Sequence, residues 1–369
     1  MSWIVEEIEA RGGAVPFDEY MGLALYHPEH GYYSTALPRY GRDGDYLTAP
    51  TASAWYARVL AHLLSEVSSC TGPIRLVDVA SGDGSLIAGV LESMDETSSQ
   101  GLSEIVSVER SRGMRSLQRD RFNGVAVPIC WCDQPGCLLP SSTPTVLHAS
   151  ELFDALPVAR VVARGSEMYE LWVVVSGGGI ELRERAPRAE VAAYFTGHGV
   201  DLEDGQVAEA SLAAEGLQRQ LLVAAGTDGL VIILDYGYES HRLYNPRGRR
   251  GGSLATFRRH RLGRDPLETP GELDLTAHVN WDDLRCAVVE GWQEIGLWPL
   301  AEFLIRAGLE REVEERGLGM SAELDAATVV ARQEIKRLLD PDGMGSDLKA
   351  LVQASGRMVD VARGTLSLP

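Results

Sequence analysis

Lysine is nearly absent from this sequence of 369 residues, in which only Lys336 and Lys349 interrupt the use of arginine as the basic residue. Acids outnumber bases by 53 to 34, which gives a formal net charge of −19. Because an acidic surface repels a phosphate backbone on average, this composition disfavours general nucleic-acid binding. It leaves room for a local basic patch, since an average does not describe one place on the surface.

Cysteine is also scarce, and the five present are too irregularly spaced for a disulfide framework. Cys130, Cys132 and Cys137 lie close together, but without a matching second pair they make a poor zinc signature. We therefore expect free thiols and no metal site. No run approaches the roughly 18 apolar residues of a membrane span, and the first ten residues carry acids rather than an apolar signal core. These absences predict a cytoplasmic protein without a membrane segment.

The sequence does contain a repeated alternation of short apolar runs and amphipathic stretches. Strands that are separated by helices imply βαβ units and a parallel, doubly wound sheet, which is an α/β fold. Strands are expected over 74–79, 104–109, 125–131, 145–149 and 229–236, and helices over 17–26, 56–69, 85–94, 111–120, 206–225, 280–296, 299–308 and 321–339.

Two strand-like runs, 168–176 and 179–186, interrupt this alternation and meet at consecutive glycines, which is a hairpin signal. The sequence therefore predicts a mostly parallel sheet domain that carries an inserted β-hairpin. The expected parts are an N-terminal cap over 1–55, a main domain over 56–310 with the insertion at about 160–205, and a helical C-terminal tail over 311–369.

The sharpest local pattern is LVDVASGDGSL at 76–86, where a strand leads through a glycine turn into a helix. Glycine lets the chain turn tightly and lets a ligand approach the backbone without a Cβ in the way. Free N–H groups at the helix start add a slightly positive surface. Asp78, Ala80, Gly82 and Gly84 are therefore candidates for binding a nucleotide cofactor.

Two acids beyond the next strands extend this candidate site. Glu109 ends the following strand, 25 residues after Gly84, where an acid can accept hydrogen bonds from ribose hydroxyls. Asp133, just past the third strand, is placed to meet an adenine amino group. NAD and S-adenosyl-L-methionine (SAM) are the two adenosine cofactors that such a site could bind. The Asp78 carboxylate beside the turn repels the pyrophosphate of NAD but attracts the sulfonium and ammonium groups of SAM. The sequence therefore predicts SAM.

Further motifs follow one another over roughly residues 15–305. They are YM at 20–21, LYHPEHGYYS at 25–34, GRDGDYLTAP at 41–50, ELFDALP at 151–157, LDYG at 234–237, PG at 270–271 and DLTAHV at 274–279. In this order, and together with the glycine turn and Glu109, they resemble the MidA family of class I SAM-dependent methyltransferases. That family includes a mitochondrial arginine methyltransferase that assists assembly of respiratory complex I.

The resemblance implies a class I methyltransferase with SAM as cofactor and an arginine in a protein partner as the favoured methyl acceptor. It also implies that Asp45, Tyr46 and Thr48 fold over the cofactor, where a lid would exclude water. Two residues depart from the family pattern: Ala80 replaces a usual glycine, and Ser150 replaces a usual asparagine. A non-catalytic assembly or binding factor that retains the fold therefore stays an alternative.

Four residues are candidates for the acceptor side of the site. Glu151 and Asp154 follow an apolar strand, at the sheet edge where doubly wound folds bind ligands. Carboxylates can hold a guanidinium bidentately, so Glu151 is the first catalytic candidate and Asp154 the second. Asp235 and His278 are expected to line the same side, with His278 as a further catalytic candidate.

One stretch, 242–264, contradicts the acidic average. A solvated loop, a contact for an acidic protein and a contact for RNA are three interpretations of it. We expect a protein substrate, because the acidic surface suits a basic target segment, and keep an RNA methyltransferase anchored by this stretch as an alternative. Its bases are Arg242, Arg247, Arg249, Arg250, Arg258, Arg259, His260, Arg261 and Arg264.

Overall fold

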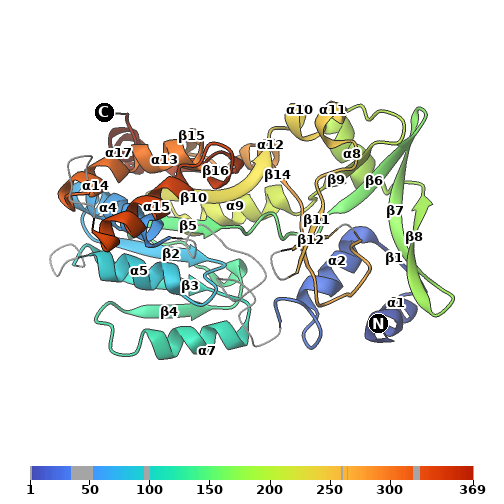
Figure 1. Cartoon of the computed structure of the whole chain (residues 1–369), viewed down its shortest axis with the longest axis horizontal. Helices are drawn as coiled ribbons and strands as arrows, with labels where there is room; N and C mark the ends of the chain where they lie inside the picture. The colour runs from blue at the N-terminus through green and yellow to red at the C-terminus, as the bar shows by residue number, and fades with distance from the viewer. Residues whose placement is uncertain are drawn as a thin grey trace.

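The computed structural model describes residues 2–34, 53–94, 100–258, 261–263, 265–318 and 325–368. Two lobes stand side by side, each built around its own sheet (Figure 1). In the described part of the chain, no helix combines the length and the apolar character that crossing a membrane requires.

The larger sheet forms the first lobe, and most of its strands are parallel. The strands from β10 to β4 run in one direction, whereas β16 runs antiparallel between β10 and β15. A short strand, β14 (Val279–Asn280), continues the pairing at the carboxyl end of β10. The expected α/β fold with a doubly wound, mostly parallel sheet is thus confirmed. In spatial order the strands are β15 (Trp292–Pro299), β16 (Leu348–Ser355), β10 (Gly229–Tyr238), β5 (Thr145–Ser150), β2 (Ile74–Val79), β3 (Leu102–Val108) and β4 (Ile129–Cys132).

Helices cover both faces of this sheet, which is why its central strands are almost wholly apolar. One face is covered by α4 (Ala54–Thr71), α5 (Ser85–Ser93), α13 (Leu300–Arg306) and α17 (Met358–Thr365), and the other by α9 (Ala214–Ala225) and α12 (Trp281–Arg285). The remaining helices of this lobe are α7 (Arg112–Arg121), η1 (Pro135–Cys137), α14 (Leu309–Glu315), α15 (Ala326–Leu338) and α16 (Met344–Asp347).

Helix α4 illustrates how the sequence sets these elements. The Ser53 hydroxyl accepts a hydrogen bond from Trp55 N and so caps the first turn. Val59, Leu63 and Val67 recur at helical spacing and are buried against the sheet.

The second lobe combines the N-terminal segment with the insertion. Strand β1 pairs antiparallel with β7, so Ala14 lies opposite Val174, and the two N-terminal helices pack on the same sheet. The expected cap and the expected hairpin are therefore parts of one unit: β6, β7, β8 and β9 form a five-stranded sheet together with β1 of the N-terminal segment, so the insertion is more than a hairpin. Its elements are α1 (Ser2–Ala10), β1 (Ala14–Pro16), α2 (Phe17–Tyr26), β6 (Ala159–Arg164), β7 (Glu167–Ser176), β8 (Gly179–Arg185), α8 (Ala189–Gly197) and β9 (Val207–Ala210).

Short elements lie between the two lobes, with α10 and α11 at the upper edge in Figure 1 and β11 and β12 near its middle. They are α10 (Ser240–Leu243), α11 (Pro246–Arg249), and a three-stranded sheet of β11 (Ala255–Arg258), β12 (Arg261–Gly263) and β13 (Asp274–Thr276).

Three sequence-based expectations for secondary structure need correction. The expected helix at 206–225 begins only with α9, because Val207–Ala210 form β9 and pair with β6. The expected helix at 280–296 ends after α12; Gly291 adopts φ +83°, and the chain then enters β15. The tail at 311–369 is helical only in part, because it also supplies β16. In each case a distant partner strand outweighs the local apolar spacing.

The first prediction concerns the stability that β16 contributes. Every residue of this strand is buried between two neighbouring strands. Leu351 is fully buried, and replacing it by alanine removes apolar contacts and leaves a cavity. We expect Leu351→Ala to lower the free energy of unfolding by about 2–5 kcal/mol. Leu139→Ala is the matched control, because Leu139 is 77% exposed. Urea denaturation followed by circular dichroism measures both, and equal effects would contradict a structural role for the C-terminal segment.

Candidate functional site

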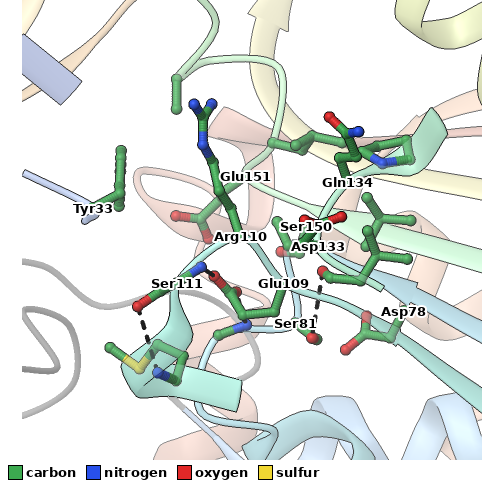
Figure 2. A pocket seen from close by; sticks show the side chains of 18 of the residues that line it. Tyr33, Asp78, Ser81, Glu109, Arg110, Ser111, Asp133, Gln134, Ser150 and Glu151 are labelled. Carbon is green, nitrogen blue, oxygen red and sulfur yellow. Dashed lines mark hydrogen bonds between the residues drawn. The ribbon is translucent and has the colours of Figure 1, made fainter. Parts of the chain in front are cut away.

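A pocket of about 610 Å³ lies where the carboxyl ends of β2, β3 and β5 meet. Doubly wound sheets bind their ligands at this edge. Figure 2 shows polar side chains from several different loops around the same space. Tyrosines from the N-terminal segment complete the wall on the side of the second lobe. Of the residues predicted from the sequence, the pocket is lined by Asp78, Ala80, Gly82, Glu109, Asp133 and Glu151.

The two glycines of the turn after β2 serve different purposes. Both adopt a left-handed backbone, with φ +56° at Gly82 and φ +79° at Gly84. Gly82 lines the pocket, and its N–H points to Glu109. Gly84 lies behind the pocket, where an added Cβ would stand 2.8 Å from Cζ of Phe122. Gly84 therefore permits close packing beneath the turn rather than contact with a ligand.

Glu109 joins two neighbouring loops at the floor of the pocket. Its Oε2 accepts a hydrogen bond from Gly82 N (2.8 Å), and its Oε1 accepts one from Ser111 N (2.6 Å). Burial raises the pKa of Glu109 to about 7, although these two backbone donors oppose the shift. A carboxylate has about four acceptor positions, so Glu109 keeps capacity for the hydroxyl groups of a ribose.

Asp78 is held from behind by a buried chain of hydrogen bonds. Asp78 Oδ1 lies 2.9 Å from His148 Nδ1, and His148 Nε2 lies 2.8 Å from the Tyr56 hydroxyl. His148 thus links Asp78 to Tyr56 through its two ring nitrogens. Asp78 Oδ2 is buried and has no hydrogen-bond partner among the described residues, although Asp78 lines the pocket.

These features fit SAM. The buried, unpartnered oxygen of Asp78 offers a negative group to an ammonium or sulfonium centre, and an unsatisfied carboxylate oxygen is costly to bury without such a partner. Glu109 offers acceptors to the ribose. Ser150, whose buried hydroxyl also lacks a partner in the described structure, stands on the same wall.

Two residues of the pocket wall have a strained backbone. Ala80 (φ +59°) and Glu151 (φ +50°) are the described non-glycine residues with positive φ. Such a conformation costs about 1–2 kcal/mol for a residue with a Cβ, and it persists only where the surroundings impose it. At Glu151 the surroundings are the end of β5, where Glu151 N donates to Leu234 O (2.8 Å).

Asp235 organises the loop that follows Glu151 instead of lining the pocket. Its Oδ2 accepts hydrogen bonds from Leu152 N (3.1 Å), Phe153 N (2.8 Å) and Asp154 N (3.4 Å). Asp235 is fully buried, and burial raises its pKa to about 7. Asp235, which was expected on the acceptor side, does not line the pocket, because backbone N–H groups bind its carboxylate.

Asp154 and His278 lie outside the lining of the pocket. Asp154 is buried beside Asp235, and burial together with Asp235 raises the pKa of Asp154 well above its ordinary value. His278 is farther back, with its ring 5.4 Å from that of Tyr238, and burial lowers its pKa to about 4. The structure thus brings neither side chain to the cofactor pocket, although Ala277, next to His278, donates its N–H to Asp154 O.

The remaining predicted residues are either at the pocket mouth or outside the described chain. Asp133 is exposed at the mouth, and its carboxylate accepts a hydrogen bond from the Cys137 thiol (3.3 Å). Asp45, Tyr46 and Thr48, expected in a lid, lie outside the described residues. Within the described ranges, no group of three or more His, Cys, Asp or Glu could hold a metal ion.

Sequence reasoning missed the residues that brace the turn from below. Gln118 on α7 is fully buried; its Nε2 donates to Ser81 Oγ (3.0 Å) and to Gly82 O (2.6 Å). His148 and Tyr56 support Asp78 in the same way. The available signal was a polar residue inside an otherwise apolar stretch, such as the histidine of TVLHAS at 145–150.

Relatives in other organisms align in sequence with almost the whole chain. A Drosophila melanogaster protein named "Protein arginine methyltransferase NDUFAF7 homolog, mitochondrial" is 26% identical over 93% of this chain and 82% of its own length. The Xenopus tropicalis protein of the corresponding name is 25% identical over 91% of this chain and 81% of its own length. These relatives correct the expected cytoplasmic location, because they are named as mitochondrial proteins.

Solved structures agree with the fold and the cofactor. A crystal structure of a COG1565 superfamily member from Burkholderia thailandensis, bound to S-adenosyl-homocysteine, is 30% identical with a TM-score of 0.83 and covers 95% of this chain and 90% of that one. A native crystal structure of a protein of this superfamily from the same organism is 28% identical with a TM-score of 0.80, at the same coverage. S-adenosyl-homocysteine is what SAM becomes after it loses its methyl group, so the cofactor of this chain is SAM.

The strain at Ala80 generates the second prediction. We expect Ala80→Gly to raise the free energy of unfolding by up to about 1 kcal/mol, because glycine tolerates positive φ. Ala88→Gly is the control; Ala88 lies inside α5, where glycine should destabilise by roughly 0.5–1 kcal/mol. Thermal unfolding with and without SAM measures both, and a loss of stability in Ala80→Gly would show that the methyl group is needed there.

Glu109 generates the third prediction, which concerns pH. With a pKa of about 7 its carboxyl group is mostly protonated at pH 6 and mostly ionised at pH 8. Because the ionised form accepts hydrogen bonds from ribose hydroxyls, SAM affinity should rise by up to about tenfold over that interval. Glu109→Gln should bind SAM more weakly and with a flat pH profile. Calorimetry at several pH values measures this, and an unchanged slope in the variant would assign it to another group.

The chain also matches a model of a protein family. A family model for S-adenosyl-L-methionine-dependent methyltransferases matches residues 55–297, from the start of α4 to β15. This range includes the glycine turn, Glu109, Glu151 and Asp235, which orders the loop after Glu151. The chain therefore belongs to this family of SAM-dependent methyltransferases.

Proposed function

We propose that this methyltransferase transfers the methyl group of SAM to a guanidinium nitrogen of an arginine in a protein partner. The observation that carries the proposal is the position of Glu151, whose strained backbone places a carboxylate on the wall of the SAM pocket. The relatives that match most of the chain are named protein arginine methyltransferases, which supports the same acceptor.

Methyl transfer requires an in-line approach of the acceptor nitrogen to the methyl carbon. Bound SAM supplies that methyl group on a positively charged sulfur and leaves as neutral S-adenosyl-homocysteine. As the new N–C bond forms and the S–C bond breaks, the guanidinium must release one proton. A carboxylate that binds two N–H groups of a guanidinium fixes its orientation and can accept that proton. We assign this role to Glu151.

Asp154 is the second acid on this side, and its surroundings favour a cation. Three neighbouring acids, Asp235, Glu151 and Asp274, raise the pKa of Asp154 beyond the effect of burial. A guanidinium that enters beside them brings the opposite charge and lowers the cost of ionising these carboxyl groups. In this proposal Asp154 attracts the acceptor electrostatically while Glu151 touches it.

The N-terminal segment forms the other wall of the acceptor path in this proposal. The Tyr26 hydroxyl donates to Ala155 O (2.8 Å), and the Tyr33 hydroxyl donates to Asp274 Oδ1 (2.7 Å). The guanidinium of Arg110 lies 4.8 Å from the centre of the Tyr26 ring. These aromatic groups narrow the space beside Glu151 and exclude water from it.

The chemical nature of the acceptor can be tested directly. Wild-type protein is incubated with radiolabelled SAM and an extract of the cell from which the gene comes, and labelled proteins are hydrolysed with acid. We expect the label in methylarginine. Label in methyllysine or in RNA would contradict the proposed acceptor, and no label in any fraction would favour the non-catalytic alternative.

Glu151 generates the fourth prediction. Glu151→Gln keeps the shape of the side chain but removes its charge and its ability to accept a proton. We expect methyl transfer to fall by about 10²-fold or more, with SAM affinity changed by less than about twofold. Glu314→Gln, at an exposed acid on α14, is the control and should leave both quantities unchanged. An equal loss of SAM binding and transfer would contradict the assigned role.

A further inference from the structure

Three cations surround one tyrosine at the carboxyl end of β10. The centre of the Tyr238 ring lies 3.9 Å from Cζ of Arg249, 4.8 Å from Nζ of Lys349 and 5.3 Å from Cζ of Arg242. Each distance is within the range of a cation–π contact. We call these four residues the Tyr238 cluster; its members come from β10, α10, α11 and β16, which meet where the two lobes join (Figure 1).

No acid forms an ion pair with a cation of the cluster in the described part of the chain, although the charge of Glu239 reaches Lys349. The neighbouring acid Glu239 is bound to Arg285 (3.4 Å), which also contacts Glu294 (2.9 Å). Three adjacent cations repel one another, so the arrangement favours any ligand that brings negative charge.

Lys349 shows that this positive charge is partly enclosed. Only 9% of the residue is exposed, in a chain that uses lysine at just one other position. Burial lowers the pKa of Lys349; Glu239 opposes this shift, whereas Arg242, Arg285 and Arg249 add to it. The same field reaches His278, because Arg249 and Lys349 add to the effect of burial on its pKa.

Strand register places Lys349, one member of the cluster, close to the acceptor side of the SAM pocket. Ser150, Leu234 and Ala350 are partners across β5, β10 and β16. Glu151 and Lys349 each stand one residue farther toward the pocket edge. Adjacent strands are about 4.8 Å apart, so the backbones at these two residues are separated by roughly 10 Å. An extended peptide covers that distance with about three residues.

We propose that the Tyr238 cluster binds acidic side chains of the protein substrate, a few residues from the arginine that is methylated. The inference rests on the proposed function for the identity of that arginine, but the site itself rests on the unpaired cations. Arginine forks and a lysine ammonium bind carboxylates with charge-assisted hydrogen bonds. The enzyme would then recognise an arginine flanked by Asp or Glu. Glu151 would bind the arginine, and the Tyr238 cluster would bind the neighbouring acid.

RNA fits the same surface less well. RNA binding needs a stripe of free cations and aromatic faces on which bases stack. The flanking arginines are divided, because Arg250 pairs with Glu203 (3.6 Å) and Arg258 with Glu272 (2.9 Å). The ring of Tyr238 already contacts the three cations of the cluster.

The test, which is the fifth prediction, measures binding without methyl transfer. Fluorescence anisotropy follows the full chain with bound SAM as it binds labelled octaglutamate, with an uncharged peptide of equal length as reference. We expect octaglutamate to bind and Arg249→Gln to weaken it by about tenfold. Arg247→Gln is the matched control, because this exposed arginine of α11 lies outside the cluster; it should change the affinity by less than about twofold.

Several results would overturn the inference. These are no binding of octaglutamate, equal weakening by both variants, displacement by inorganic phosphate at equal concentration, or tighter binding of octauridylate. Thermal unfolding and SAM affinity of each variant confirm that the fold is intact, and Arg242→Gln provides a second variant if Arg249→Gln is unstable. If octaglutamate binding depends on Arg249 but no methylarginine forms, the cluster stands and the proposed acceptor fails; the reverse result retains the acceptor and rejects the cluster.

Discussion

The carboxylate of Glu109 determines how the two central loops of the pocket lie relative to each other. It receives one N–H from the turn after β2, at Gly82, and one from the loop after β3, at Ser111. Because each contact is to the backbone, this one side chain links the two loops directly, and Gln118 supports the first of them from below. The ligand is then bound by a group whose geometry is already set, which reduces the ordering that binding requires.

Buried acids serve as supports elsewhere in the site as well. Asp235 orders the backbone of the loop after β5, and Asp78 is oriented by His148 and Tyr56. A buried carboxylate is costly unless hydrogen bonds satisfy it, and the two acids meet this requirement differently. Asp235 is satisfied by the protein alone, whereas Asp78 keeps one buried oxygen for a ligand. This difference separates a supporting acid from a binding acid.

Sequence patterns could predict the parts of the site that are local in the chain. The strand, the turn at Gly82 and α5 follow one another directly, so residue spacing alone indicates them. Strands β9 and β16 could not be predicted in this way, because each is defined by a partner strand distant in sequence. The role of Asp235 was also beyond the pattern. An acid at the end of an apolar strand has the same sequence signature whether it faces a ligand or the backbone of another loop.

The pairing of β1 with β7 has a consequence for biosynthesis. Ala14 leaves the ribosome well before its partner Val174, and at ordinary rates of translation the delay is on the order of ten seconds. During this interval Ile4, Ile8 and Phe17, which are fully buried in the mature protein, have no sheet to cover them. The nascent chain must therefore pass through a stage in which its first helices are exposed and open to chaperones. The N-terminal tyrosines can take their positions in the wall of the SAM pocket only after most of the second lobe has been synthesised.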